Sequence, residues 1–475
     1  MNETYTPSKP TSSELVGDGR SEDSVRRRGG LVRRWREASP RARFLSIAVL
    51  LLLLALAVRV GYVIHTDNFA TRLDSHSYDQ LAQQLARGNG WAYGPSAYRP
   101  PGYPIFLAGI YLLVGIPHGV FTSGIPHGVF TSVRLVEAVF ATLTVGLLGL
   151  LALQVGGRTA MLITLAVGAI YLPLVLVGVS LMSESLFALL VLAATNCAVR
   201  ARAPKHRYRW IVLAGAFAGL SALTHGNGLV LALALPFVVW TGRPRLSRAA
   251  IAAPALLLVV MALTIMPWTI RNANAQHAFV PVTTELGPTL KGTYNNFSAG
   301  RRFIWSGHGY KDYNSITKNR NLTEAQRDSR LTSAVISKIG KHPAWLPEAM
   351  FWNTMRLLDL QGRRVSRMTA HTDEDATAAI ADIGVISFWI IAALAIVGGF
   401  TSAARRGPRA LWIVPLVLWL SVAPVTTGTP RFRAALDPFV IVLAAFGIQA
   451  LAAALGRKGK ASRPLGRLLH APPAA

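Results

Sequence analysis

Charged side chains that could carry chemistry occur where polar segments of the chain meet long apolar ones. In the first polar stretch, the run Asp74-Ser75-His76-Ser77-Tyr78 places Asp74 and Tyr78 four residues apart, on one face if the stretch is helical. A carboxylate in this position could act as a base toward a substrate hydroxyl. The same spacing also fits a solvated loop in which Asp74 merely caps the helix that follows.

Arg99 stands directly before Pro100-Pro101, at the start of an apolar segment. Guanidinium groups form paired hydrogen bonds with phosphate oxygens, so Arg99 is well placed to hold a phosphate at the bilayer surface. The alternative is an interfacial arginine that only reaches toward lipid headgroups, which is common in membrane proteins.

Four more charged residues lie at the ends of apolar segments. Glu184 stands between two such segments, where a carboxylate is costly and usually faces a cavity or a partner. Arg271 follows the end of a segment, and Arg431 and Arg433 precede the last one. Cations on the predicted external side are not required by topology, so they suggest anionic partners there.

Carboxylates beside several arginines suit chemistry on a phosphate ester. One group can serve as a base for an acceptor hydroxyl, and the cations can stabilise a leaving phosphate. The sequence contains no Walker loop, Rossmann glycine pattern, HExxH or Gly-x-Ser-x-Gly motif. Nucleotide use and the common hydrolase mechanisms therefore lack support.

The composition indicates a membrane protein. The 475 residues are 52% hydrophobic and only 15% charged, yet they carry a formal net charge of +27. A soluble enzyme explains neither feature, because soluble domains average about 25% charged residues, and a nucleic-acid-binding protein explains only the charge. Membrane proteins explain both if the basic residues lie in loops on one side of the bilayer.

The sequence predicts an all-α polytopic membrane protein with about 10–11 transmembrane helices and external juxtamembrane helices. Eleven apolar segments are candidates for these helices, and two of them are short. They lie at 44–64, 102–116, 134–156, 159–178, 181–199, 211–223, 229–241, 249–269, 383–400, 411–427 and 436–455.

Basic residues orient the predicted bundle. Nine arginines against three acids between Arg20 and Arg43 place the N-terminus in the cytoplasm. Further basic segments predicted on that side lie at 200–209, 243–248, 405–409 and 457–467. Eleven full crossings cannot place both basic ends inside. Either the Pro-rich segment 102–116 is re-entrant or interfacial, or 211–241 crosses once with a break at 224–227.

These assignments divide the chain into three parts: a disordered basic cytoplasmic tail at 1–43, a transmembrane domain at 44–455 and a basic cytoplasmic tail at 456–475. The domain includes two external loops, which lie at 65–100 and 271–381. In the longer loop, the run from Trp345 to Leu360 is typical of an amphipathic helix at the membrane interface. We expect this loop to be an extended cap without a separate core.

Five motifs in one order resemble a known family. They are D-x-x-x-Y followed by RPPGYP.FLA, then SESLF, GLSALTHGNGL, PWTIRN with FVPVTT and GTYNN, and TPRFRAALDP. They extend from about residue 72 to 450 and resemble polyprenyl-phosphate-sugar-dependent glycosyltransferases of the GT-C superfamily. The closest branch is glycosyltransferase family 39-like, related to protein O-mannosyltransferases and the aminoarabinose transferase of lipid A.

The resemblance implies an inverting transfer in which Asp74 is the catalytic base and Tyr78 lines the site. Arg99 matches the basic residue that grips the lipid phosphate. Arg99 and Arg271 would stabilise the charge of the leaving polyprenyl phosphate, and Glu184 matches the family's intramembrane glutamate.

The chain departs from the family pattern at two positions. Ser75 stands where the family often has Glu. His225 stands where it usually has Lys or Arg, so this substrate-binding position no longer carries a fixed cation.

The implied partners are a polyprenyl-phosphate sugar donor, membrane lipids and an acceptor glycan, lipid or protein, with no nucleic acid. The implied location is the plasma membrane with the active site external. Some relatives use divalent ions, but no metal-ligand cluster is visible, so no metal or cofactor is expected. The alternatives are a transporter or flippase of lipid-linked sugars, against which the lack of two related halves counts, and a catalytically inactive membrane scaffold.

Overall fold

The computed structural model describes residues 38–66, 69–91, 96–116, 127–241, 247–426 and 428–461. These residues form helices and connecting segments, with no strand among them. The predicted all-α fold is confirmed. The chain divides into two units, 1–50 and 51–475, and everything described below about the site lies within the second.

Six helices in the described part are long and apolar enough to cross a membrane. They are α2 (Pro40–His65), α5 (His127–Ile170), α7 (Ser183–Arg200), α10 (Arg248–Gln276), α17 (Ala378–Gly399) and α20 (Asp437–Ala461). Helix α5 contains a kink at Gly157, where φ is 82°. This left-handed conformation favours glycine and separates the two apolar segments predicted on either side of it.

The other apolar segments form helices of at most 18 residues, namely α4 (Gly102–Val114), α6 (Leu172–Val177), α8 (Arg207–Thr224), α9 (Leu231–Val239) and α19 (Ile413–Val422). At 1.5 Å per residue, the 13 residues of α4 extend about 20 Å, which is less than the hydrocarbon core of roughly 30 Å. Helix α4 is therefore too short to cross alone. The 3-10 helix η1 (Gly226–Val230) separates α8 from α9, so the break predicted at 224–227 is also present.

The membrane helices pack around one large hydrophobic core, to which α5, α7, α8, α9, α10, α19 and α20 contribute. Helix α8 lies between α7 and α10, and α20 lies against both α17 and α5. Small connecting helices complete this part of the chain. They are α18 (Ser402–Arg406), η3 (Arg409–Trp412) and η4 (Pro430–Arg433).

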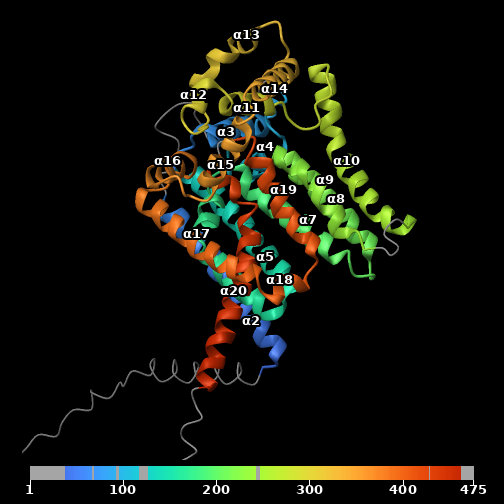
Figure 1. The fold of residues 1–475 in the computed structure, drawn as a ribbon, viewed down its shortest axis with the longest axis vertical. Helices are drawn as coiled ribbons and strands as arrows, with labels where there is room; N and C mark the ends of the chain where they lie inside the picture. The colour runs from blue at the N-terminus through green and yellow to red at the C-terminus, as the bar shows by residue number, and fades with distance from the viewer. Residues whose placement is uncertain are drawn as a thin grey trace, which may run out of the picture. The chain divides into compact units, whose positions relative to one another are not determined.

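Two polar segments fold into helices between the membrane helices. The first contains α3 (Leu73–Ala86). The second contains α11 (Leu286–Thr293), α12 (Asn296–Ala299), η2 (Gly307–Tyr313), α13 (Asn314–Thr317), α14 (Glu324–Lys341), α15 (Trp345–Leu357) and α16 (Arg363–Glu374). Figure 1 shows α11 to α14 gathered at one end of the second unit, far from the C-terminal end of α20. The helix predicted from Trp345 is confirmed as α15.

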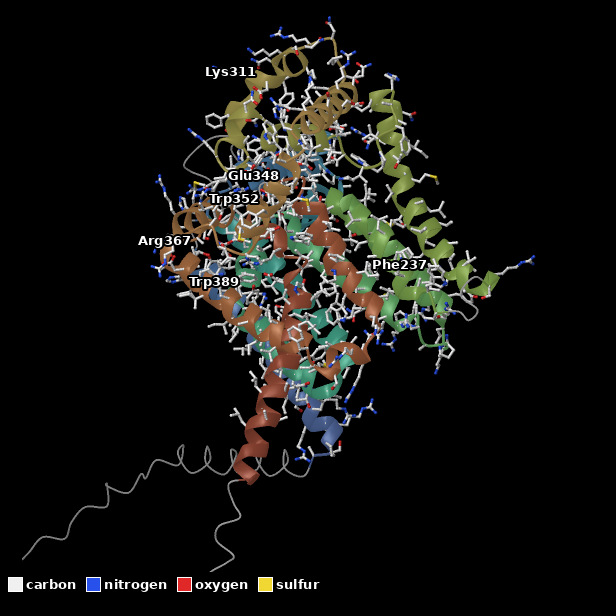
Figure 2. The ribbon with its side chains drawn as sticks, viewed as in Figure 1. Phe237, Lys311, Glu348, Trp352, Arg367 and Trp389 are labelled. Atoms are coloured by element: carbon white, nitrogen blue, oxygen red, sulfur yellow. The ribbon has the colours of Figure 1, made fainter. Side chains whose placement is uncertain are left out.

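The long polar segment has a core of its own, so our expectation of a cap without one is wrong. Its buried members come from α11, η2, α14, α15 and the intervening loop, and include Leu290, Tyr294, Phe303, Tyr313, Leu331, Val335 and Ala349. These residues stand alone or in short apolar runs such as Phe303-Ile304-Trp305, so no long apolar run marks them in the sequence. Trp389 of α17 donates a hydrogen bond to the Leu358 carbonyl at 2.9 Å, which ties a membrane helix to the end of α15 (Figure 2).

The predicted tails fall largely outside the described residues, which exclude 1–37 and 462–475. Most of the basic segment 243–248 also lies outside them. Helix α2 already begins at Pro40, and α20 continues to Ala461. The tail predicted from 456 therefore begins as part of this last helix.

Helices α17 and α20 approach each other so closely that only glycine fits at their crossing. A Cβ atom on Gly398 would lie 1.8 Å from the Leu443 carbonyl oxygen. Gly398→Ala should therefore push the helices apart and lower the free energy of unfolding by about 1–3 kcal/mol. Thermal unfolding of the purified protein in detergent measures this. Gly399→Ala is the matched control, because nothing lies within 4 Å of that position; equal loss in both variants would contradict the prediction.

Candidate active site

Asp74 lies in the first turn of α3, directly after Leu73, whose φ of 46° is in the left-handed region. Such a conformation is strained for leucine and turns the chain sharply before Asp74. The Ser75 hydroxyl accepts a hydrogen bond from the Arg72 N–H at 2.9 Å. Ser75 thus takes the capping role that the alternative interpretation gave to Asp74, whose carboxylate points elsewhere.

The Asp74 carboxylate is held between two arginines. Its Oδ1 accepts from Nη2 of Arg99 and its Oδ2 accepts from Nη2 of Arg431. Burial alone would raise the pKa of Asp74, but the charges of Arg431 and Arg99 outweigh it and hold the pKa well below its usual range. Asp74 is therefore firmly ionised at neutral pH.

Arg431 also reaches a second carboxylate. Its Nε lies 3.3 Å from Oε1 of Glu184, which stands in the first turn of α7. The side chain of Glu184 is only 5% exposed, so this ion pair is shielded from water. One guanidinium therefore bridges the carboxylates of Asp74 and Glu184, which are 110 residues apart in sequence.

Tyr78 closes a ring of contacts around these charges. Its hydroxyl donates to the Ser183 hydroxyl at 3.1 Å, and Ser183 donates in turn to Oε2 of Glu184 at 3.2 Å. The guanidinium of Arg99 lies over the face of the Tyr78 ring, 4.9 Å from its centre, which is a favourable cation–π geometry. The predicted pair Asp74 and Tyr78 therefore does share one helix face directed at the same arginine.

A third carboxylate, Glu285, joins the cluster and was missed by the sequence reasoning. Its Oε1 accepts from Nη1 of Arg99 at 2.8 Å, so Arg99 bridges Asp74 and Glu285. Burial raises the pKa of Glu285, against the opposing charge of Arg99. The sequence signal was weak, because Glu285 is one of several acids in a long polar segment and no motif spacing distinguishes it.

The two polar segments are fastened together where Arg99 and Glu285 leave them. The Thr284 N–H donates to the Ala97 carbonyl at 3.0 Å, and the Thr283 hydroxyl donates to the Tyr98 carbonyl. At the N-terminus of α14, Glu324 accepts from the Ala97 N–H at 2.8 Å and from the hydroxyls of Ser96 and Thr284. These bonds fix the position of Arg99 relative to Glu285.

Arg271 lies beside this junction. Its Nη1 donates to the Ser96 carbonyl at 2.8 Å, and its guanidinium lies over the rings of Trp268, at 4.8 Å, and Trp91, at 5.9 Å. These contacts support the segment that carries Arg99. The predicted role of Arg271 at the phosphate stays a prediction.

The start of α7 is positioned by a buried carboxylate, Glu137 of α5. Its Oε2 accepts from the Leu181 N–H at 3.1 Å, and its Oε1 accepts from the Tyr103 hydroxyl. Leu181 has a φ of 53° and no exposed surface, so its strained backbone is held by packing and by this bond. The strain at Leu181, like that at Leu73, lies at or just before a helix start that presents a site carboxylate.

His225 lies on the other side of Glu184. Its ring stacks on Phe187 with centroids 5.1 Å apart and meets Phe432 edge-on at 6.2 Å. These residues and Asn227 line a small cavity with Glu184. His225 therefore lies beside Glu184 as part of an aromatic wall, and its predicted role in substrate binding stays a prediction.

Arg433 belongs to a separate buried ion-pair network. It lies 2.9 Å from Oδ2 of Asp359 and 3.1 Å from Oδ1 of Asp437, and Tyr171 donates to Asp437 at 2.9 Å. Two carboxylates thus neutralise Arg433 within the protein. These contacts give it a structural role, and its predicted role in substrate binding stays a prediction.

The carboxylates of the site are engaged by arginines of the protein itself. Within the described residues, no group of three or more His, Cys, Asp or Glu side chains is arranged to hold a metal. Both oxygens of Asp74 already accept from guanidinium groups, and Oε1 of Glu184 lies 3.3 Å from Nε of Arg431.

Solved structures share the fold, whereas no family model and no curated protein matches the chain. The oligosaccharyltransferase AglB from Archaeoglobus fulgidus, in complex with an inhibitory peptide and a dolichol-phosphate, superposes with a TM-score of 0.53 at 15% identity, over 92% of this chain and 53% of its own. Its apo form gives 0.52 at 15% identity, over 89% and 52%. ArnT from Cupriavidus metallidurans bound to undecaprenyl phosphate gives 0.39 at 16% identity, over 89% and 80%, an overlap too low to support an argument.

The chain spans about half the length of the oligosaccharyltransferases that it matches. At this identity the likeness concerns the fold alone. The narrower resemblance to family 39 and to mannosyltransferases stays a prediction. The chain is a multi-pass, all-α membrane protein whose fold is shared with an archaeal oligosaccharyltransferase.

Proposed function

We propose that the protein is an inverting membrane glycosyltransferase that moves a sugar from a polyprenyl-phosphate donor to an acceptor hydroxyl. The observation that carries this proposal is the position of Asp74 between Arg99 and Arg431, beside Glu184. Two guanidinium groups at the ends of apolar helices can hold a lipid phosphate, and carboxylates next to them can orient and deprotonate a hydroxyl.

The reaction requires stabilisation of the charge that develops on the leaving phosphate. Arg99 and Arg431 are partly buried, with side chains each 11% exposed, so their charges act in a medium of low dielectric constant. Their positions are fixed by carboxylates before any substrate binds. Because these cations are already in place, they do not have to reorient as charge develops on the leaving phosphate, as water molecules would.

The shared fold supports the proposal, because the similar AglB structure holds a dolichol-phosphate. We further propose a site on the external face of the plasma membrane, with the N-terminus in the cytoplasm, because basic segments predominate on the opposite side. The acceptor belongs to one of three classes: a glycan, a lipid or a protein.

Asp74→Asn should reduce sugar transfer at least 100-fold, because the neutral amide no longer fixes both guanidinium groups by charge. The assay incubates membranes that contain the variant with a panel of labelled polyprenyl-phosphate sugars and identifies the labelled product. Asp382→Asn is the matched control, since Asp382 pairs with Arg367 at an exposed position on α17. Unimpaired transfer by Asp74→Asn would overturn the proposed function.

Arg99→Ala should raise the KM for the donor by about 10–100-fold, the effect expected for a lost charge-assisted hydrogen bond of roughly 1.5–3 kcal/mol. Arg99→Lys should recover part of this loss, because a lysine keeps the charge but not the paired donors. Initial rates at varied donor concentration measure both effects. Arg367→Ala, at the exposed position on α16 labelled in Figure 2, is the control. An unchanged donor KM in Arg99→Ala would contradict the assignment of Arg99 to the phosphate.

A further inference from the structure

We propose that Glu285 is the general base of this transfer and that Asp74 instead holds the two arginines in place. The inference rests on the proposed function and deepens it, because it assigns the proton of the acceptor hydroxyl to a residue that no sequence motif marks. It also reverses the role that the family resemblance implies for Asp74.

Asp74 is poorly suited to take a proton. Both of its oxygens accept hydrogen bonds from guanidinium groups, one from Arg99 and one from Arg431. A proton on either oxygen would stand beside two fixed positive charges and would weaken the ion pairs that position them. The same two charges keep the pKa of Asp74 far below neutrality, which makes it a weak base.

Glu285 differs from Asp74 in how many of its oxygens are bonded to arginines and in the direction of its pKa shift. Only Oε1 is bonded to a cation, the Nη1 of Arg99 at 2.8 Å, and Oε2 accepts no hydrogen bond from any residue in the described part. The side chain is 27% exposed, close to the 30% of Asp74, so an acceptor hydroxyl can approach Oε2, whereas both oxygens of Asp74 are already bonded to arginines. Burial and the like charges of Asp74 and Glu184 raise the pKa of Glu285, opposed by Arg99 and Arg431. Where the environments of two neighbouring carboxylates move their pKa values apart, one typically exchanges the proton and the other stays ionised.

The position of Glu285 is as well defined as that of Asp74. It directly precedes α11, and the two threonines before it, Thr283 and Thr284, are bonded to the backbone of Tyr98 and Ala97. Its carboxylate shares Arg99 with Asp74. An acceptor hydroxyl bonded to Glu285 would therefore lie beside the same guanidinium group that holds the donor phosphate.

The proposed step balances as follows. The acceptor O–H bond breaks, and its proton passes to Oε2 of Glu285. The acceptor oxygen forms a bond to the anomeric carbon of the donor sugar from the face opposite the phosphate. The bond between the anomeric carbon and the phosphate oxygen breaks, and its electron pair leaves with the polyprenyl phosphate, whose added negative charge Arg99 and Arg431 stabilise.

Donor binding would also strengthen this base. A phosphate that binds Arg99 competes for the Nη1 that now donates to Glu285. Loss of that bond removes charge stabilisation from the carboxylate, so the pKa of Glu285 rises further and its proton affinity increases. The base would thus become strongest when the donor is in place.

The first test compares Glu285→Gln with the unaltered protein. We expect kcat to fall by about 10²–10⁴-fold, the usual contribution of a general base, while the donor KM changes less than about threefold. Glu348→Gln is the matched control, because Glu348 is an exposed glutamate on α15, labelled in Figure 2. Thermal unfolding and the donor KM verify that the variant is folded. A kcat within threefold of the unaltered protein would overturn the inference while leaving the proposed function intact.

The second test uses the pH dependence of the rate. The base must be deprotonated, so the rate should rise with pH through the pKa of Glu285. Profiles of kcat/KM for the donor report the free enzyme, whereas kcat reports the donor complex. We expect the acid limb of kcat to lie at higher pH than that of kcat/KM, and we expect it to be absent in Glu285→Gln. An acid limb that persists unchanged in Glu285→Gln would assign the titrating base to another residue.

The third test separates a base from a structural residue. Glu285→Ala should recover at least tenfold of its lost rate when formate is added, because a small carboxylate can occupy the space of the missing side chain and accept the proton. A residue that only positioned Arg99 would show no such rescue, and failure of formate at any concentration would count against the base. Lack of transfer by the unaltered protein with every donor would instead overturn the proposed function itself.

Discussion

The ion pair between Asp74 and Arg431 is the interaction on which the site depends. It joins residues 357 positions apart in sequence, one at the start of α3 and the other in η4, just before the last membrane helix. Arg431 extends the link to Glu184 at the start of α7. Three helix starts are therefore held together at one point by a single guanidinium. Without this cation, two carboxylates would face each other in a partly buried setting, which is strongly unfavourable.

The surrounding structure serves to hold these charges where they are. Two strained residues lie at the starts of the helices that carry Asp74 and Glu184: Leu73 is the first residue of α3, and Leu181 stands two residues before α7. Such strain persists only where packing over-determines the backbone, and Leu181 is fully buried with its N–H bonded to Glu137. Favourable contacts elsewhere in the fold thus compensate for the backbone strain that orients these two carboxylates.

The sequence predicted what depends on local pattern. Apolar length marked the membrane helices, and the i, i+4 spacing placed Asp74 and Tyr78 on one face toward Arg99. It could not predict which charges meet, because that depends on contacts between distant segments. Arg431 and Arg433 are two residues apart, yet one bridges Asp74 and Glu184 while the other is neutralised by buried aspartates. Nothing in their spacing distinguishes them.

The net charge of +27 gives a misleading picture of the site. Among the residues that meet there, the three carboxylates of Asp74, Glu184 and Glu285 outnumber the two guanidinium groups of Arg99 and Arg431. A phosphate cannot simply be attracted to such a cluster; it has to displace a carboxylate from an arginine. Asp74 accepts two such bonds and Glu285 only one, so Glu285 is the carboxylate more readily displaced. Binding of the anion and release of a base are then one event, governed by the competition for Arg99.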